Sequence, residues 1–227
     1  ASKGSSTFSA ITPMGRQHEN DREATAADLK WLADPAEEPE PFGDGGTKMA
    51  WNTFNVVSIY PNGNPVMSDV NQRWVGDCCA CAVIASMAYL YPRFVKHIIK
   101  DNMDKTYTVT MYDPKGKQIS VGVGGDYFIG NSGDLGALGG RNKEVTWATI
   151  LEKAMIKWNQ IYQGSSNVGG IGTEYVSAIF TGDGESVGFG ANALIAEDLQ
   201  RAVEVSLKQG RLVIGGFTRS GEQVDQN

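Results

Sequence analysis

The stretch from Cys78 to Tyr91, CCACAVIASMAYLY, contains no charged residue and is rich in alanine. A helix that is apolar all round must be buried on every side, so this run predicts the central helix of a hydrophobic core. Gly76 permits a tight entry into the helix, and Asp77 is a residue type that favours the N-cap position. Pro92 ends the helix and can begin a second one over PRFVKHIIKDN.

The surrounding segments predict both helices and strands. A β-hairpin is expected over 105–123, an amphipathic helix over 144–164 that stops at Gly164, and a last helix over 196–210 that stops at Gly210. WNTFNVVSIY (51–60) predicts a strand closed by the PNGNP turn, and RLVIGGFT (211–218) predicts a buried strand. The glycine-rich stretch 124–140 matches no phosphate-binding motif and is expected to be a connecting loop, and 164–186 is expected to be a second glycine-rich loop.

Composition limits the class of protein. A chain of 227 residues with 41% hydrophobic residues can bury a substantial core. The net charge of -6 argues against nucleic-acid binding, which needs a basic surface. No apolar run approaches the roughly 20 residues of a transmembrane segment. Residues 1–50 are expected to be a flexible arm or the remnant of a pro-segment, because 33–46 is rich in proline and acidic residues, although 25–34 can form one short helix.

Cys78, Cys79 and Cys81 are the only cysteines. Adjacent cysteines form a disulfide only with strain, so they are no disulfide framework. A zinc site needs a second group of ligands, which a chain with two histidines and no other cysteine pair does not offer. A thioredoxin-type motif needs a βαβ setting, which is missing. Because free cysteine is a small hydrophobe, we interpret Cys79 and Cys81 as packing residues.

Cys78 differs because it begins the apolar helix. Unpaired N–H groups and the helix dipole stabilise a thiolate there, and a thiolate attacks carbonyl carbons. Gln72 lies shortly before it, and the Gln72 amide together with the Cys78 N–H can donate two hydrogen bonds to an oxyanion. A glutamine followed by a cysteine at the start of a buried helix is the arrangement of a papain-like thiol protease.

Four separated motifs resemble the calpain family. SDVNQRWVGDC (68–78) is similar to the calpain segment in which Asp, Gln-Gly and Gly-Asp-Cys precede the nucleophile helix. EVTWATILEKAMIKW (144–158) resembles the run Trp-x-x-Leu-Leu-Glu-Lys-Ala-Tyr-Ala-Lys, IFTGDG (179–184) resembles Phe-Thr-Gly-Gly, and 104–127 resembles a strand pair of the same domain. The resemblance covers roughly residues 55 to 217. It implies an α+β papain-like protease core that cleaves protein or peptide substrates through a thioester on Cys78, with Gln72 as oxyanion donor.

The resemblance also implies calcium regulation, with Asp69 and Glu152 as ligands. Two hard carboxylates and carbonyl oxygens of the PNGNP turn suit Ca²⁺. The alternative for Glu152 is a solvated residue that pairs with Lys153 or Lys157. Arg73 and Cys79 depart from the family pattern, which has Gly and Trp at these positions.

The family's His-Ala-Tyr and Asn-Pro-Trp-Gly motifs are absent. His97 is expected to lie too far from Cys78 to act as its base, since the apolar helix alone is about 20 Å long, and His18 falls in the arm.

We therefore expect residues 51–210 to be the mainly helical Cys-bearing subdomain, with its β-hairpin, and 211–227 to begin the second subdomain. A downstream segment, or a second chain autolytically cut from the same precursor, would supply His and Asn. The alternatives are a non-catalytic binding or interaction module and, more weakly, an inhibitor or pro-domain.

Overall fold

The computed structural model describes residues 21–42, 49–130, 132–182 and 195–215. The helices are α1 (Ala26–Ala33), the 3-10 helix η1 (Met67–Asp69), α2 (Cys78–Leu90), α3 (Pro92–Ile98), α4 (Trp147–Tyr162), α5 (Thr173–Thr181) and α6 (Ala196–Lys208). The strands are β1 (Ala50–Thr53), β2 (Ile99–Asp101), β3 (Tyr107–Tyr112), β4 (Gln118–Val123) and β5 (Asp126–Ile129).

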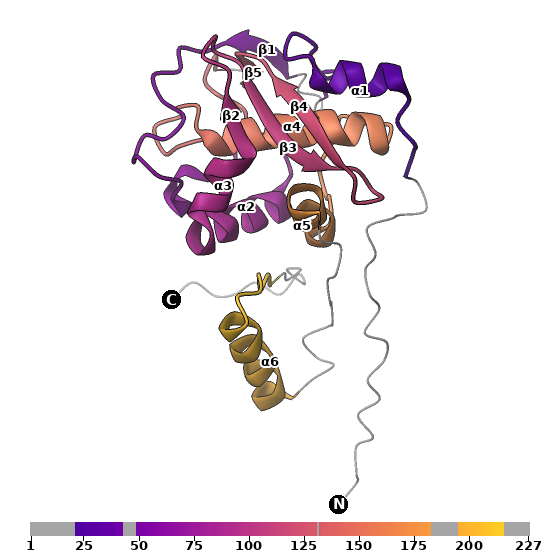
Figure 1. Ribbon diagram of the computed structural model, residues 1–227. Coiled ribbons are helices and arrows are strands. Elements are labelled where there is room, and N and C mark those ends of the chain that lie inside the picture. The colour runs from indigo at the N-terminus through magenta and orange to yellow at the C-terminus, as the bar shows by residue number, and fades with distance from the viewer. Residues whose placement is uncertain (1–20, 43–48, 131, 183–194, 216–227) are drawn as a thin grey trace, which may run out of the picture.

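The fold mixes helices with small antiparallel sheets, as the α+β prediction requires. Strands β2, β3 and β4 form one sheet in that order, and β1 pairs with β5. Helix α4 crosses behind β3 and β4, while α2, α3 and α5 gather at the lower side of the body (Figure 1). Helix α1 packs against β4 and α4. The core therefore lies around α4, enclosed by both sheets and the other helices.

The predicted hairpin is confirmed as β3 and β4, with Tyr112 opposite Gln118 next to the turn. Alternate residues of β3 are buried, which is the period of a strand with one face on the core. Asp113 Oδ1 accepts hydrogen bonds from the N–H groups of Lys115 and Lys117, and Gly116 adopts a φ of 78°. The turn is thus stabilised by side-chain and glycine chemistry that the sequence already contains.

The predicted apolar helix is confirmed as α2, but it is not buried on every side. Val83, Ile84 and Met87 face the core, whereas Cys78 and Tyr89 are exposed. The next helix is shorter than expected. It ends at Ile98, because Ile99–Asp101 leaves the helix to pair with β3 as the edge strand β2.

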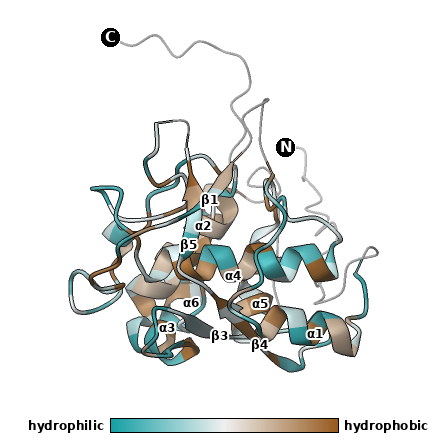
Figure 2. Cartoon of the chain, turned by 90° about the horizontal axis from the view of Figure 1, so that it is seen from above, coloured by the Kyte–Doolittle hydropathy of each residue, from teal (hydrophilic) through white to brown (hydrophobic). Residues whose placement is uncertain are grey.

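Helix α4 is confirmed, and Gly164 follows it with a φ of 73°. The polar side of this amphipathic helix is not exposed to solvent, since even Lys153 and Lys157 are buried. Hydrophilic and apolar stretches alternate along α4 at the centre of the molecule (Figure 2). Its polar side is covered because backbone carbonyl oxygens of neighbouring segments accept hydrogen bonds from both ammonium groups.

The prediction of a flexible arm is wrong for residues 21–42. Helix α1 forms with a Thr25–Asp28 capping box, and Leu32 is completely buried. The chain that follows runs along α4, where Lys157 Nζ donates to the Asp34 carbonyl at 2.8 Å and Glu38 forms an ion pair with a buried lysine. An acidic, proline-rich segment orders here because cations inside the fold bind its oxygens. Residues 1–20 and 43–48 lie outside the described residues.

Both glycine-rich stretches contain regular structure that the sequence did not predict. β5 lies in the first, pairing with a β1 shorter than expected, and α5 lies in the second. The buried apolar side chains of these elements include Tyr127, Phe128 and Phe180. Their glycine content hid the short apolar runs, which become stable only by packing on neighbours.

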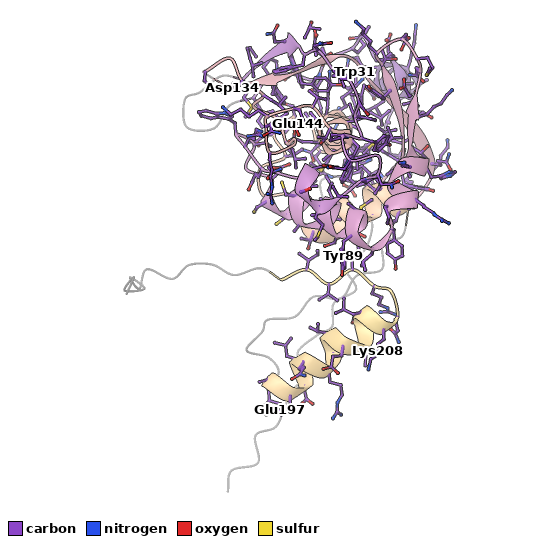
Figure 3. All side chains as sticks on the ribbon, turned by 90° about the vertical axis from the view of Figure 1, so that its left-hand side faces the viewer. Trp31, Tyr89, Asp134, Glu144, Glu197 and Lys208 are labelled. Atoms are coloured by element: carbon purple, nitrogen blue, oxygen red, sulfur yellow. The ribbon has the colours of Figure 1, made fainter. Side chains whose placement is uncertain are left out.

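The last helix is confirmed as α6, and Gly210 follows it with a φ of 71°. None of its residues is buried, and Figure 3 shows it projecting away from the main body, with Tyr89 on the side of the body that faces it. The buried strand expected after it is not found in 211–215, which is irregular and partly exposed because no described strand pairs with it. Residues 216–218 lie outside the described residues.

Among the helices that the structure describes, none alone is long and apolar enough to cross a membrane. The pair α2 and α3, bent by 113°, reaches that length and composition only together.

Candidate active site

Cys78 is the first residue of α2, and it is exposed. The Cys81 N–H donates the first helical hydrogen bond, to the Asp77 carbonyl at 3.0 Å. The N–H groups of Cys78 and Ala80 precede that bond and have no carbonyl of their own helix to bind. A carbonyl oxygen brought next to the Cys78 sulfur would therefore meet backbone N–H donors at the positive end of α2.

Gln72 is held in the loop that enters α2. Its Nε2 donates to the Val75 carbonyl at 2.9 Å and to Asp77 Oδ1 at 3.5 Å. These bonds fold residues 72–77 into a tight turn, which carries the amide back to the residue that precedes Cys78. The contact to Asp77 is the longer of the two, so it is the hydrogen bond for which a substrate oxygen competes more easily.

Two further segments flank this turn. On one side lies a hollow of about 450 Å³, where Gln72, Arg73 and Trp74 meet Asp134 and Lys143 of the 130–144 loop. Elsewhere on the turn, the Gly170 N–H donates to the Gly76 carbonyl at 3.2 Å, so the loop between α4 and α5 packs against the entry to α2. Sequence reasoning missed this hollow because its walls come from segments far apart along the chain.

Asp77 occupies the N-cap position, but its side chain caps nothing. It is fully buried, and its Oδ1 accepts from Gln72 and from Cys81 Sγ. Asp77 Oδ2 and Glu152 Oε1 are buried oxygens with no other hydrogen-bond partner. Burial raises the pKa of Asp77 to about 6.

The two buried carboxyls interact with each other. Burial first, and the negative charge of Asp77 second, raise the pKa of Glu152 well above its ordinary value. A hydrogen bond from Glu152 stabilises the charged form of Asp77. We infer that Glu152 is protonated and donates to Asp77, which satisfies both orphan oxygens and ties the start of α2 to α4.

Cys79 and Cys81 are both partly buried. The Cys81 thiol donates to Asp77 Oδ1 at 3.5 Å and packs against the core. Burial, followed by the charge of Asp77, raises the pKa of this thiol. Cys81 is therefore protonated, in keeping with its interpretation as a packing residue.

A comparison with protein families matches residues 50–226 to the description "calpain family cysteine protease". The chain belongs to the calpain family. Its function is accordingly that of a cysteine peptidase, and the family predicted from the four motifs is confirmed. None of the curated proteins matches the chain.

In this calpain-family domain the two predicted calcium ligands have separate protein partners. Asp69 is buried and accepts from Asn62 Nδ2 at 2.9 Å, from the Val66 N–H at 3.2 Å and from Trp147 Nε1 at 2.7 Å. Glu152 accepts from the Leu138 N–H at 3.0 Å and faces Asp77. The alternative of a solvated Glu152 that pairs with a lysine is wrong, because Glu152 is 1% exposed.

The residues as arranged do not form a complete calcium site. The described part of the chain contains no group of three or more His, Cys, Asp or Glu side chains that could hold a metal. The PNGNP turn does lie beside Asp69, through Asn62, but the Gly63 carbonyl in that turn accepts a hydrogen bond from Lys96 Nζ at 2.6 Å. N–H donors and an ammonium group thus occupy oxygens that calcium would need.

His97 is exposed on α3, which leaves the C-terminal end of α2 after the bend. Cys78 stands at the opposite end, and a helix of this length spans about 20 Å. The structure places His97 where the sequence led us to expect it, too far away to serve as the base for Cys78. His18 lies outside the described residues.

Proposed function

We propose that the chain is the nucleophile-bearing part of a cysteine endopeptidase, with Cys78 as the nucleophile and Gln72 as an oxyanion donor. The observation that carries the proposal is the exposed thiol at the first residue of a helix that packs one side on the core, preceded by an amide that is hydrogen-bonded to its entry turn. Family membership supports the class of reaction.

The proposed reaction begins when the Cys78 thiolate attacks the carbonyl carbon of a peptide bond. The carbonyl oxygen becomes an oxyanion that accepts from the Cys78 N–H and from Gln72 Nε2, which leaves its 3.5 Å contact with Asp77. The C–N bond then breaks, the amine departs with a proton from an imidazolium group, and water hydrolyses the thioester.

The imidazole must come from outside the described residues, since His97 is remote. We propose that a His and an Asn are supplied by a segment downstream or by a second chain cut from the same precursor. The exposed side of α2, which carries Cys78 and Tyr89, is the surface of this domain next to which such a segment has to bring its imidazole.

Calcium regulation stays a prediction that rests on the resemblance. The hydrogen bonds that Asp69 accepts from Asn62 and Trp147, and the pairing of Glu152 with Asp77, count against a site in this arrangement. A calcium titration followed by thermal unfolding tests it, because a bound ion raises the unfolding temperature. If Asp69→Asn and Glu152→Gln leave that shift unchanged, the two residues are not the ligands.

The test of the peptidase proposal uses this chain together with the His- and Asn-bearing segment that the proposal requires, with an unfolded protein as substrate. Cys78→Ala should lower kcat by a factor of about 10⁴ or more, since it removes the attacking atom. Gln72→Ala should lower kcat by about 10²- to 10³-fold with little change in KM. Cys79→Ala, on the same helix turn, is the matched control and should keep its activity.

Alkylation distinguishes a catalytic Cys78 from a non-catalytic one, and the experiment needs no substrate. Iodoacetamide should label Cys78 far faster than Cys79 or Cys81, and mass mapping of single-cysteine variants assigns the sites. Equal or negligible labelling at all three, together with a lack of peptidase activity in the assay above, would support a non-catalytic calpain-like interaction module instead.

A further inference from the structure

Cys81 stands one helical turn after Cys78, which makes a Cys-X-X-Cys pair at the start of α2. Side chains three apart on a helix lie on the same face, with Cβ atoms about 5–6 Å apart, whereas residues one or two apart do not face each other. Of the three cysteines, only Cys78 and Cys81 therefore share a face.

The two thiols also differ in the way that a redox pair requires. Cys78 is exposed to small molecules in solution, and Cys81, one turn further along α2, is partly buried, with its S–H directed to Asp77 Oδ1 at 3.5 Å. One thiol can meet an oxidant, and the other is held nearby but sheltered from it. Disulfide geometry needs Cβ atoms roughly 3.5–4.5 Å apart, so the first turn must tighten by about 1 Å.

We propose that Cys78 and Cys81 form a reversible disulfide when the protein meets a peroxide. This goes beyond the proposed peptidase function. It makes the nucleophile subject to reversible oxidation, with Cys81 as the resolving cysteine, and it protects Cys78 from irreversible oxidation. Cys79 takes no part, because its side chain leaves the helix in another direction.

The disulfide between Cys78 and Cys81 forms in two steps. The Cys78 thiolate attacks one peroxide oxygen, the O–O bond breaks, and the products are Cys78 sulfenic acid and hydroxide. The Cys81 sulfur then attacks the Cys78 sulfur, the S–S bond forms and the S–O bond breaks. The leaving hydroxide takes the Cys81 proton and departs as water. A dithiol such as dithiothreitol reverses the change by thiol–disulfide exchange.

Mass mapping of peroxide-treated protein tests the proposal without any peptidase assay. The tryptic peptide between Arg73 and Arg93 should lose two hydrogens, its iodoacetamide labelling at Cys78 should disappear, and dithiothreitol should restore both. Cys79→Ala, the matched control, should behave in the same way. Cys81→Ala and the more conservative Cys81→Ser should instead stop at a Cys78 sulfenic acid that dimedone traps.

Two results would overturn the proposal. One is an internal disulfide that persists in both Cys81 variants but is lost in Cys79→Ala, which would identify an adjacent Cys78–Cys79 bond. The other is sulfenic or sulfinic acid at Cys78 in the unmodified sequence with no disulfide. Neither depends on whether Cys78 cleaves peptides, so a failed peptidase test and a failed disulfide test are distinguishable.

Discussion

Asp77 and Glu152 show how one buried pair connects the candidate site to the core. Asp77 directly precedes Cys78, and Glu152 lies in the middle of α4, which is buried along most of its length. A proton between the two carboxyls lets both sit out of water without two negative charges. The orientation of the first turn of α2 therefore depends on a hydrogen bond that exists only while that proton is bound.

The pair predicts that stability falls as the pH rises. An acid whose pKa is higher in the folded than in the unfolded chain contributes stability that is fully present below the unfolded pKa and is lost as the pH rises through the folded pKa. For Asp77 this window runs from 3.8 to about 6, and the raised pKa of Glu152 extends it upwards. We expect the free energy of unfolding to fall by roughly 2–3 kcal/mol across it.

Glu152→Gln isolates this effect. The glutamine still accepts from the Leu138 N–H and donates to Asp77 without carrying charge, so the contribution of Glu152 disappears while the contribution of the buried Asp77 remains. Denaturant unfolding should therefore show a shallower fall than in the parent chain above about pH 6, where Asp77 has already titrated. Glu197→Gln, at an exposed position on α6, should follow the parent chain at every pH. Identical pH profiles for Glu152→Gln and the parent would contradict the shared proton.

The segment 33–42 is an element of the fold even though, beyond the last residue of α1, it is neither helix nor strand. It lies so close to β4 that a Cβ on Gly122 would come within 2.4 Å of the Ala33 carbonyl oxygen. Lys157 Nζ lies between the Asp34 and Gly122 carbonyls, at 2.8 Å from each oxygen. Gly122 on β4 leaves room for this irregular segment to pack closely. Lys157 on α4 binds it to β4 through hydrogen bonds to both.

Gly122→Ala should destabilise the protein by about 1–3 kcal/mol, because the added methyl group collides with backbone that cannot move without breaking the lysine contacts. Gly125→Ala is the nearby control, since a Cβ there meets nothing closer than 3.6 Å. Chemical denaturation of both variants checks the prediction. Equal stabilities would mean that 33–42 does not pack on β4 in solution.

Lys157→Met should cost roughly 2 kcal/mol or more, because it leaves two carbonyl oxygens without their donor. Burial lowers the pKa of Lys157 to about 8, because the charged form is less stable inside the protein than in water. Methionine carries no charge and therefore avoids this unfavourable contribution. The loss should therefore come from the orphaned carbonyls, and a thermal unfolding series measures it. Lys100→Met, at an exposed position on β2, should be nearly neutral.

Considered as one molecule, the folded unit extends beyond the calpain family match. The match begins at residue 50, whereas α1 and the 33–42 segment cover α4 and bury Leu32. The Arg22 N–H also donates to the Tyr162 carbonyl at 2.8 Å, which joins the start of the described chain to the end of α4.

A chain that begins at Met49 should therefore fail to fold cooperatively. It exposes Lys153, Lys157 and the apolar surface around Leu32, a loss comparable to the 5–15 kcal/mol that ordinarily stabilises a domain. A chain that begins at Asp21 keeps every contact described above and is the control. Near-ultraviolet circular dichroism and thermal unfolding measure the difference. A cooperative transition for the shorter chain would show that the family core suffices.

The parts of the fold that sequence reasoning predicted are those with local causes. Helix α2, the β3–β4 hairpin and the ends of α4 and α6 follow from apolar period, turn residues and glycines with positive φ, all encoded within a few positions. The place of Cys78 at a helix start was predictable for the same reason. The family was predictable because its motifs are short and continuous.

Long-range contacts decided the rest. The sequence shows charges at Lys153, Lys157 and Glu152, but only packing reveals that carbonyls, aromatic rings and Asp77 surround them. β5, α5 and the order of 33–42 likewise depend on partners that are distant along the chain. Local chemistry determines where a helix begins and ends. Whether its polar groups meet water or protein depends on segments that come together only when the chain folds.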